Sequence, residues 1–346
     1  MRVRSVEFLT IKLMFLFPNL INLLTMLAPI KPAPPVIRTD ERVIIEDMID
    51  IICAICGEKQ QIKTLYPPTF DRKNVSKNTY SARRLPDKVH YRIVKCLRCS
   101  LIFSSPIISL KEISKFYKDS LCNYEDQIPY LIKTYLNIIK NIWNKVPKNP
   151  KVLEVGCGNG FFLKALLDSK FTKNIFGVEP SSKMVLEADS SLRNKIKISI
   201  FKSNMFAKES FDLILCFHTL DHMYDPNEFI RNSYSMLKRN GYVIIVVHDT
   251  EGLSVKLFGE NSAIFDIEHI YLFNKRTLKL LFTRNKFNVV KIFNLINNYP
   301  LRYWITMSGI PLPLKKIANF FIGILGISRI TLSIPAGNIG IIAKKS

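Results

Sequence analysis

The sequence predicts an α/β protein in which a doubly wound sheet follows a small cysteine-rich module. Three observations predict this fold: two Cys-x-x-Cys pairs, a glycine-rich turn between a buried strand and a helix, and a carboxylate at the end of the next strand. The chain has 346 residues, which is enough for about two domains.

The composition is that of a globular protein, with 48% hydrophobic and 23% charged residues. The formal net charge of +22 permits an anionic partner such as nucleic acid, a lipid surface or a phosphorylated substrate. A general enrichment in lysine, isoleucine and asparagine explains the same charge without any partner. Because the sequence has no dense basic arm or Arg-Gly run, nucleic acid is an open but unfavoured partner.

The cysteines indicate a metal site in a reducing compartment. Cys53-x-x-Cys56 and Cys96-x-x-Cys99 each form a knuckle that presents two thiolates, and together they supply the tetrahedral sulfur set that suits structural Zn²⁺. The loop over residues 61–91 is polar, so a metal crosslink would replace a core there. Two unligated pairs, or one redox-active pair, are the alternatives. The remaining cysteines do not fit a secreted disulfide framework, which favours a cytoplasmic location.

The first 47 residues are expected to be a leader or linker. Residues 8–30 are mostly apolar and read as a membrane anchor, although Lys12 and Pro18 interrupt them. Peripheral membrane contact is a second reading, and translation from Met48 is a third. Residues 31–35 are proline-rich and read as a linker.

A nucleotide-binding βαβ unit is predicted at residues 151–179. A buried strand over 151–155 runs into Gly156-Cys157-Gly158-Asn159-Gly160 and then into a helix over 161–167. Glycines permit positive φ and let the backbone approach a ligand closely. The next strand, 175–178, ends in Glu179, whose carboxylate can accept ribose hydroxyls. The spacing is Gly-x-Gly-x-Gly rather than the dinucleotide form, so the ligand needs no pyrophosphate site.

Four segments resemble motifs of class I S-adenosylmethionine (SAM)-dependent methyltransferases. Residues 152–160 resemble their first motif, 177–181 their ribose-binding motif, 211–222 their fourth strand and its loop, and 237–243 the turn that opens strand five. The last of these departs from the family by having Arg-Asn-Gly in the turn. The resemblance implies a Rossmann-like, seven-stranded doubly wound sheet with a small N-terminal zinc-ribbon module.

The resemblance also implies which residues hold SAM. The implied contacts of the methionine end are Glu154, Gly156, Cys157, Gly158 and Gly160, and those of the ribose are Glu179 and Pro180. Asn204 or Met205 would contact the adenine, and Phe217 and His218 would lie under the sulfonium. For the glycines, turn geometry alone is the alternative.

The candidate catalytic groups lie after strands four and five. Glu268-His269 is similar to the Glu-His pair of zinc-ribbon sugar C-methyltransferases, although the tyrosine expected two residues before the glutamate is Asp266. A histidine can remove a proton as the methyl group arrives, and a neighbouring carboxylate can orient it. The catalytic candidates are therefore His269 with Glu268, and His222 with Asp221. Packed loop histidines are the alternative.

The predicted organisation is a leader over 1–47, a zinc-ribbon module over 48–105, a helical connector over 106–148 and the methyltransferase domain over 149–346. A cap insertion is expected at about residues 294–336, within which the apolar residues 317–327 follow Lys315-Lys316. This segment is too short to span a bilayer. It would lie on a membrane, cover a greasy substrate pocket, or pack as a buried cap helix.

The leading functional hypothesis is an enzyme that transfers a methyl group from SAM to a small molecule: a sugar, nucleotide-sugar, lipid-linked or quinone-like acceptor. An RNA methyltransferase that grips phosphate with its zinc ribbon is one alternative, and a non-catalytic scaffold is another. The loop over 217–222 lacks the Asn/Asp-Pro-Pro-Tyr pattern of amino-directed base methyltransferases, which argues against that subclass.

Overall fold

The computed structural model describes residues 48–70, 88–118 and 124–346, all within one compact unit, Arg42–Ser346. The predicted leader over residues 1–47, with its apolar segment and linker, lies outside the described residues, as does most of the polar loop between the cysteine pairs. Within the described ranges, no helix is long and apolar enough to cross a bilayer.

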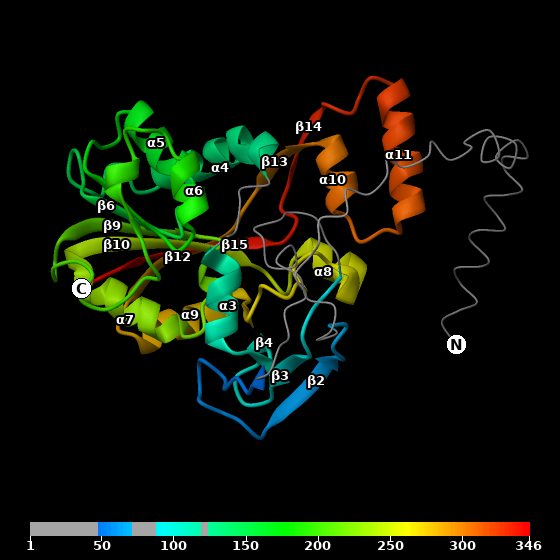
Figure 1. Ribbon diagram of the computed structural model, residues 1–346, viewed down its shortest axis with the longest axis horizontal. Coiled ribbons are helices and arrows are strands. Elements are labelled where there is room, and N and C mark those ends of the chain that lie inside the picture. The colour runs from blue at the N-terminus through cyan, green and yellow to red at the C-terminus, as the bar shows by residue number, and fades with distance from the viewer. Residues whose placement is uncertain (1–47, 71–87, 119–123) are drawn as a thin grey trace, which may run out of the picture. The chain divides into compact units, whose positions relative to one another are not determined.

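A seven-stranded mixed sheet forms the centre of the molecule (Figure 1), and the prediction of this sheet is confirmed. Its order is β12-β15-β10-β9-β6-β7-β8, and β15 runs antiparallel to both of its neighbours while the other strands are parallel. The bounds in chain order are β6 Val152–Val155, β7 Ile175–Glu179, β8 Ile196–Ile198, β9 Phe211–Phe217, β10 Leu237–His248, β12 Asn288–Asn294 and β15 Asn338–Lys344. The winding reverses beside β6, where ligands of such sheets bind.

Helices cover both faces of the sheet because its central strands are apolar on both sides. Along β9, Leu213 and Leu215 face one core and Ile214 and Cys216 face the other, as the two-residue period of a strand requires. The first core holds α4 Ile128–Lys140 and α5 Phe161–Asp168; the second holds α3 Leu110–Lys118, α7 Pro226–Met236 and α9 Lys275–Arg284. The short helix α6 Ser182–Glu187 packs with the β7 edge.

Two predicted elements differ slightly at their ends. The helix expected over 277–285 is α9, which begins at Lys275 because Asn274 caps it in a reciprocal capping box with Thr277. The strand expected over 242–247 is β10, which begins at Leu237 and pairs with β9 through a register shift before Tyr242.

The cysteine-rich module shares a sheet with the larger domain. The order is β11-β4-β3-β2, with β2 Ile62–Tyr66, β3 Ile93–Cys96, β4 Ile102–Ser104 and β11 Tyr271–Leu272. A second small pair joins β1 Met48–Ile49 to β5 Ile107–Ile108. Because β11 comes from the C-terminal half of the chain, this shared sheet packs the module on the main core. The domain boundaries at residues 48–105 and 149–346 remain predictions.

The cap fills the segment between β12 and β15, where the sequence placed an insertion. It consists of β13 Asn297–Pro300, α10 Leu301–Met307, α11 Leu312–Ile324 and β14 Thr331–Ile334, and β13 pairs with β14 at its base. Before it, α8 Leu253–Phe258 follows β10. In the fully described helix α11 only Ile322 is buried, so the reading of residues 317–327 as a buried cap helix is wrong.

Candidate functional site

The glycine-rich turn after β6 depends on positive φ at Gly156, Gly158 and Gly160, with φ values of 74°, 54° and 74°. At Gly156 a Cβ atom would lie 2.2 Å from Thr219 Oγ1, so the turn packs directly on the loop after β9. Gly160 is the residue before α5, where a Cβ would press on Ile196 at 3.1 Å. The backbone at Gly156 and Gly158 lines the cavity described below, whereas Gly160 lies outside its lining and contributes to the shape of the turn.

Glu179 at the end of β7 braces this turn. Its carboxylate accepts hydrogen bonds from the backbone N–H groups of Gly158 and Ser181, each at 2.9 Å. Burial raises the pKa of Glu179, and the two N–H groups oppose that rise. Ser181 in turn caps α6 by accepting a hydrogen bond from the Met184 N–H at 3.2 Å.

Glu154 is a second buried carboxyl group facing the same space. Its Oε2 has no hydrogen-bond partner among the described residues. Burial, with the charge of Glu179 as a further cause, raises the pKa of Glu154 well above its usual range. Two buried carboxyl groups that line one cavity favour a cationic ligand, since a positive charge reduces the penalty of ionising both.

A cavity of about 430 Å³ opens at the carboxyl ends of β6, β9 and β10. It brings together the predicted cofactor residues Glu154, Gly156, Cys157, Gly158, Glu179, Pro180, Phe217 and His218 with the predicted catalytic residues His222, Glu268 and His269. Gly160, Asn204 and Met205 lie outside its lining, so an adenine contact at Asn204 or Met205 gains no support from the cavity.

Aromatic side chains outside the predicted site residues also line this cavity. Tyr117, Tyr124 and Tyr135 come from the connector before β6, and the Tyr135 ring lies 4.3 Å from the ring of Phe217, centroid to centroid. The cap adds Tyr303, Trp304 and Met307. Sequence reasoning missed these residues because aromatic spacing alone does not separate a core position from a cavity wall.

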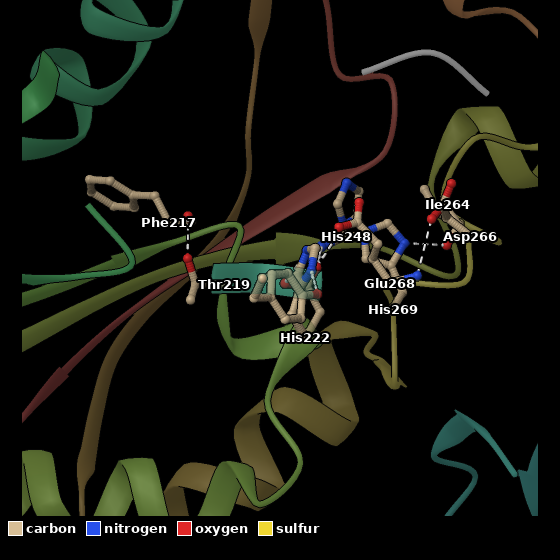
Figure 2. Close-up of polar contacts among 10 residues, drawn as sticks. Phe217, Thr219, His222, His248, Ile264, Asp266, Glu268 and His269 are labelled. Atoms are coloured by element: carbon tan, nitrogen blue, oxygen red, sulfur yellow. Dashed lines mark hydrogen bonds and ion pairs between the residues drawn. The ribbon is translucent and has the colours of Figure 1, made fainter. Parts of the chain in front are cut away.

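Four of the five histidines in the chain, His218, His222, His248 and His269, gather in the cavity. The His248 and His269 ring centroids are 4.3 Å apart, and those of His222 and His269 are 4.9 Å apart (Figure 2). His222 ends a 3₁₀ turn over Leu220–His222 after β9, and its Nδ1 lies 3.0 Å from the Tyr117 hydroxyl.

Asp221 connects these histidines. It is fully buried, and its Oδ2 accepts a hydrogen bond from His248 Nδ1 at 2.6 Å. Burial by itself would raise the pKa of Asp221, but the His248 hydrogen bond and the charges of His248, His222 and His269 hold it well below its usual range. Asp221 also lies 3.9 Å from His222 Nε2, the partner that the sequence suggested, but its shorter contact is with His248, a residue missing from the predicted set.

His269 is oriented by the backbone. Its Nδ1 lies 2.8 Å from the carbonyl oxygen of Ile264, whereas the sequence suggested Glu268 for this role. The loop is fixed from outside as well, because Ser104 Oγ donates to the His269 carbonyl oxygen at 2.9 Å and the Ile270 N–H donates to the Asp221 carbonyl oxygen at 2.8 Å. Among these loop contacts, Ser104 comes from the cysteine-rich module.

The four paired cysteines form a cluster that could hold a metal ion, with their sulfur atoms all within 4.8 Å of one another. Cys53 and Cys99 sulfurs are 3.2 Å apart, and those of Cys56 and Cys96 are 3.4 Å apart. Zn–S bonds of about 2.3 Å in a tetrahedron place sulfurs about 3.8 Å apart, so the cluster fits Zn²⁺. Burial raises the pKa of the Cys99 thiol to about 11, and a bound cation would favour the thiolate.

Comparison with known proteins agrees with this geometry. Residues 125–292 match a family model described as a methyltransferase domain. The strand order and the glycine turn of the chain are consistent with this match, which covers slightly less than half of the chain.

Among curated relatives, the chain is 32% identical over 117 residues to the ubiquinone biosynthesis O-methyltransferase of Pelagibacter ubique, a match that covers 32% of this chain and 48% of the relative. It is 28% identical over 125 residues to the mitochondrial ubiquinone biosynthesis O-methyltransferase of Saccharomyces cerevisiae, covering 33% of this chain and 40% of the relative. The chain thus matches less than half the length of either relative. The solved YcgJ protein of Bacillus subtilis is 18% identical, covers 62% of this chain and 98% of its own, and has a TM-score of 0.43.

Proposed function

We propose that this protein is an enzyme that transfers a methyl group from SAM to a hydroxyl group of a small, quinone-like acceptor. One observation carries the proposal: a single cavity holds both the glycine turn with its two carboxyl groups and the histidine cluster. The curated relatives named as ubiquinone biosynthesis O-methyltransferases support the acceptor class.

The residues at the turn fit SAM. When bound, SAM supplies an electrophilic methyl group on a positively charged sulfur, and it also carries an ammonium group. The Glu154 carboxylate, whose Oε2 lacks a hydrogen-bond partner among the described residues, would bind a positive group of this ligand. Glu179 would hold the ribose, since each carboxylate oxygen keeps acceptor capacity beyond its one backbone N–H bond.

The other side of the cavity suits an acceptor with a flat or apolar body and a polar end. Leu257, Tyr303 and Trp304 supply apolar surface, while His222 and His269 lie at the polar end. A neutral histidine there would accept the proton that the acceptor hydroxyl loses. Sugar, nucleotide-sugar and lipid-linked acceptors remain alternatives, and an RNA substrate or a non-catalytic scaffold role stays less favoured.

We further propose that the four-cysteine cluster holds structural Zn²⁺. The cluster offers four sulfur ligands and is largely buried, with Cys53 and Cys96 almost inaccessible to solvent. Structural zinc sites have four protein ligands, whereas a catalytic zinc ion needs an open position. The predicted cytoplasmic location stays a prediction.

Replacement of His269 by alanine is expected to lower kcat by about 10²- to 10⁴-fold, the usual contribution of a positioned acid–base group. The measurement is transfer of a labelled methyl group from SAM to a prenylated catechol, with SAM affinity measured in parallel. His90→Gln serves as the matched control, because His90 is the one histidine outside the cavity lining. Unchanged turnover in His269→Ala would remove this residue from the reaction.

A further inference from the structure

Three side chains beside the histidine cluster present ligand atoms to one point. One potential metal-binding atom from each of Asp221, His222 and His269 lies within 4.8 Å of the other two. Asp221 Oδ1 is fully buried, has no hydrogen-bond partner among the described residues, and lies 3.9 Å from His222 Nε2. Burying a carboxylate oxygen without a hydrogen-bond partner costs free energy unless a positively charged group or ion contacts it.

In each of these three side chains, the second nitrogen or oxygen atom already contacts a neighbouring group. The Ile264 carbonyl lies 2.8 Å from His269 Nδ1, the Tyr117 hydroxyl lies 3.0 Å from His222 Nδ1, and His248 Nδ1 lies 2.6 Å from Asp221 Oδ2. A carbonyl can only accept, so His269 carries its proton on Nδ1 and presents the lone pair of Nε2. Outer hydrogen bonds that fix ligand orientation in this way are typical of protein metal sites.

The local charge also favours a cation. The chain carries a net charge of +22, yet Asp221, Asp266 and Glu268 are all buried around this one region. Burying so many carboxyl groups together in a basic protein is unfavourable unless a positive charge lies among them.

We propose that Asp221, His222 and His269 form a binding site for a divalent first-row metal ion, separate from the four-cysteine cluster. Two imidazoles and one carboxylate suit Mn²⁺, Fe²⁺ or Zn²⁺ and leave coordination positions open. These positions face the cavity, because His222 and His269 both line it. An acceptor with two adjacent oxygens would complete the coordination.

The role given to the acceptor rests on the proposed function, whereas metal binding itself does not. A divalent ion at this point would stabilise the anion that remains when an acceptor hydroxyl loses its proton. His222 and His269 would then act as ligands, and the loss of activity in His269→Ala would follow from loss of the ion. Activity alone therefore does not distinguish a base from a ligand, and binding must be measured directly.

The test titrates Mn²⁺ into full-length protein whose cysteine cluster is loaded with zinc, and follows free Mn²⁺ by electron paramagnetic resonance. Mn²⁺ prefers oxygen and nitrogen to thiolates, so it reports on this site and not on the cluster. One bound equivalent is expected. His222→Gln and Asp221→Asn should abolish it, and Tyr117→Phe should weaken it by about 10- to 100-fold, as loss of an outer hydrogen bond does.

His90→Gln is the control and should bind Mn²⁺ as the wild type does. SAM titration of each variant shows that it is folded and separates the two hypotheses. If Mn²⁺ binds but SAM does not, the proposed function fails and the metal site stands. If the wild type binds no Mn²⁺, or His222→Gln binds it equally well, the metal site is overturned.

An independent observation concerns the outer surface of the cap. Seven large apolar side chains of the cap are well exposed, and we call them the cap face: Leu312, Leu314, Phe320, Phe321, Ile324, Leu325 and Ile330. The charged residues among them are Lys315, Lys316 and Arg329, and the sequence contains no acidic residue after Glu268. Contiguous apolar surface with only positive charge is typical of contact with an anionic bilayer.

We infer that the cap face docks on a membrane that contains anionic lipid. Lysines near a bilayer surface attract anionic headgroups while apolar side chains enter the interface. The adjoining helix α10 contributes Tyr303, Trp304 and Met307 to the cavity lining, so docking would place the cavity next to the bilayer. An acceptor dissolved in the membrane could then reach the histidines without crossing water.

Sedimentation of the full chain with vesicles tests this inference. Binding is expected to phosphatidylcholine vesicles that contain phosphatidylglycerol, and more weakly to phosphatidylcholine alone. The double variant Phe320→Ser/Phe321→Ser should lose binding, and so should Lys316→Glu/Arg329→Glu, which leaves the hydrogen bond from Lys315 Nζ to the Thr306 carbonyl in place. Leu186→Ser changes an exposed leucine on α6, outside the cap face; it is the control and should bind normally. Vesicle binding that the cap variants retain, or a dimer that they disrupt, would overturn the inference.

Discussion

Loss of the metal from the four-cysteine cluster is expected to disable methyl transfer even though the cluster lies outside the cavity. Cys96 ends β3 and Cys99 precedes β4, so a metal ion bound by the cluster would fix the turn between these strands. β4 pairs with β11, and Ser104 at its end donates to the His269 carbonyl. If the turn loosens, the loop that holds His269 loses its support, and a displacement of about 1 Å can reduce turnover about 100-fold.

The experiment compares Cys96→Ser with Cys216→Ala, a buried cysteine in β9 outside the cluster. Zinc content, melting temperature and turnover are measured on the same samples. Cys96→Ser should lose zinc, melt at a lower temperature and lose turnover by about 100-fold or more, because structural zinc contributes directly to folding free energy. A zinc-free protein with full turnover would contradict the supporting role given to the cluster.

Replacement of Glu179 by alanine is expected to reduce SAM affinity by about 100-fold or more. The substitution removes the carboxylate that holds the Gly158 and Ser181 N–H groups and leaves both donors buried. It also removes the acceptor that we propose for the ribose hydroxyls of SAM. Isothermal titration calorimetry with SAM measures the loss, and Glu187→Ala on the exposed side of α6 is the control. Wild-type affinity in Glu179→Ala would mean that SAM does not bind at this turn.

The same titration should show tighter SAM binding at pH 8 than at pH 6. Burial, together with the charge of Glu179, raises the pKa of Glu154 in the folded protein above its value in the unfolded chain. The contribution of protonated Glu154 to folding stability is therefore complete at low pH and is lost as the pH rises through the raised pKa. A cationic ligand favours ionised Glu154, so binding should release a proton. Titrations in buffers of different ionisation enthalpy measure that proton directly.

Short-range sequence patterns predicted much of the fold and part of the candidate site. The glycine turn at Gly156–Gly160, the alternating apolar strands and the acidic Glu179 are short-range features, because each depends on residues close together in the chain. They predicted the seven-stranded sheet, the βαβ unit and a cysteine set with metal-binding geometry, and the structure brings each together. Asn204 and Met205 rested on family position alone, and the cavity does not include them.

The sequence by itself determined the class of fold and the glycine turn with Glu154 and Glu179, which line the cavity, since backbone turns and strand periodicity follow from local sterics. Only the tertiary structure decided the histidine cluster, because His248 and Asp221 are 27 residues apart and meet through the parallel pairing of β9 and β10. It also decided the contact of Ser104 with His269, across 165 residues, and the exposure of α11. Such contacts depend on how elements pack, which apolar and polar spacing along the chain does not specify.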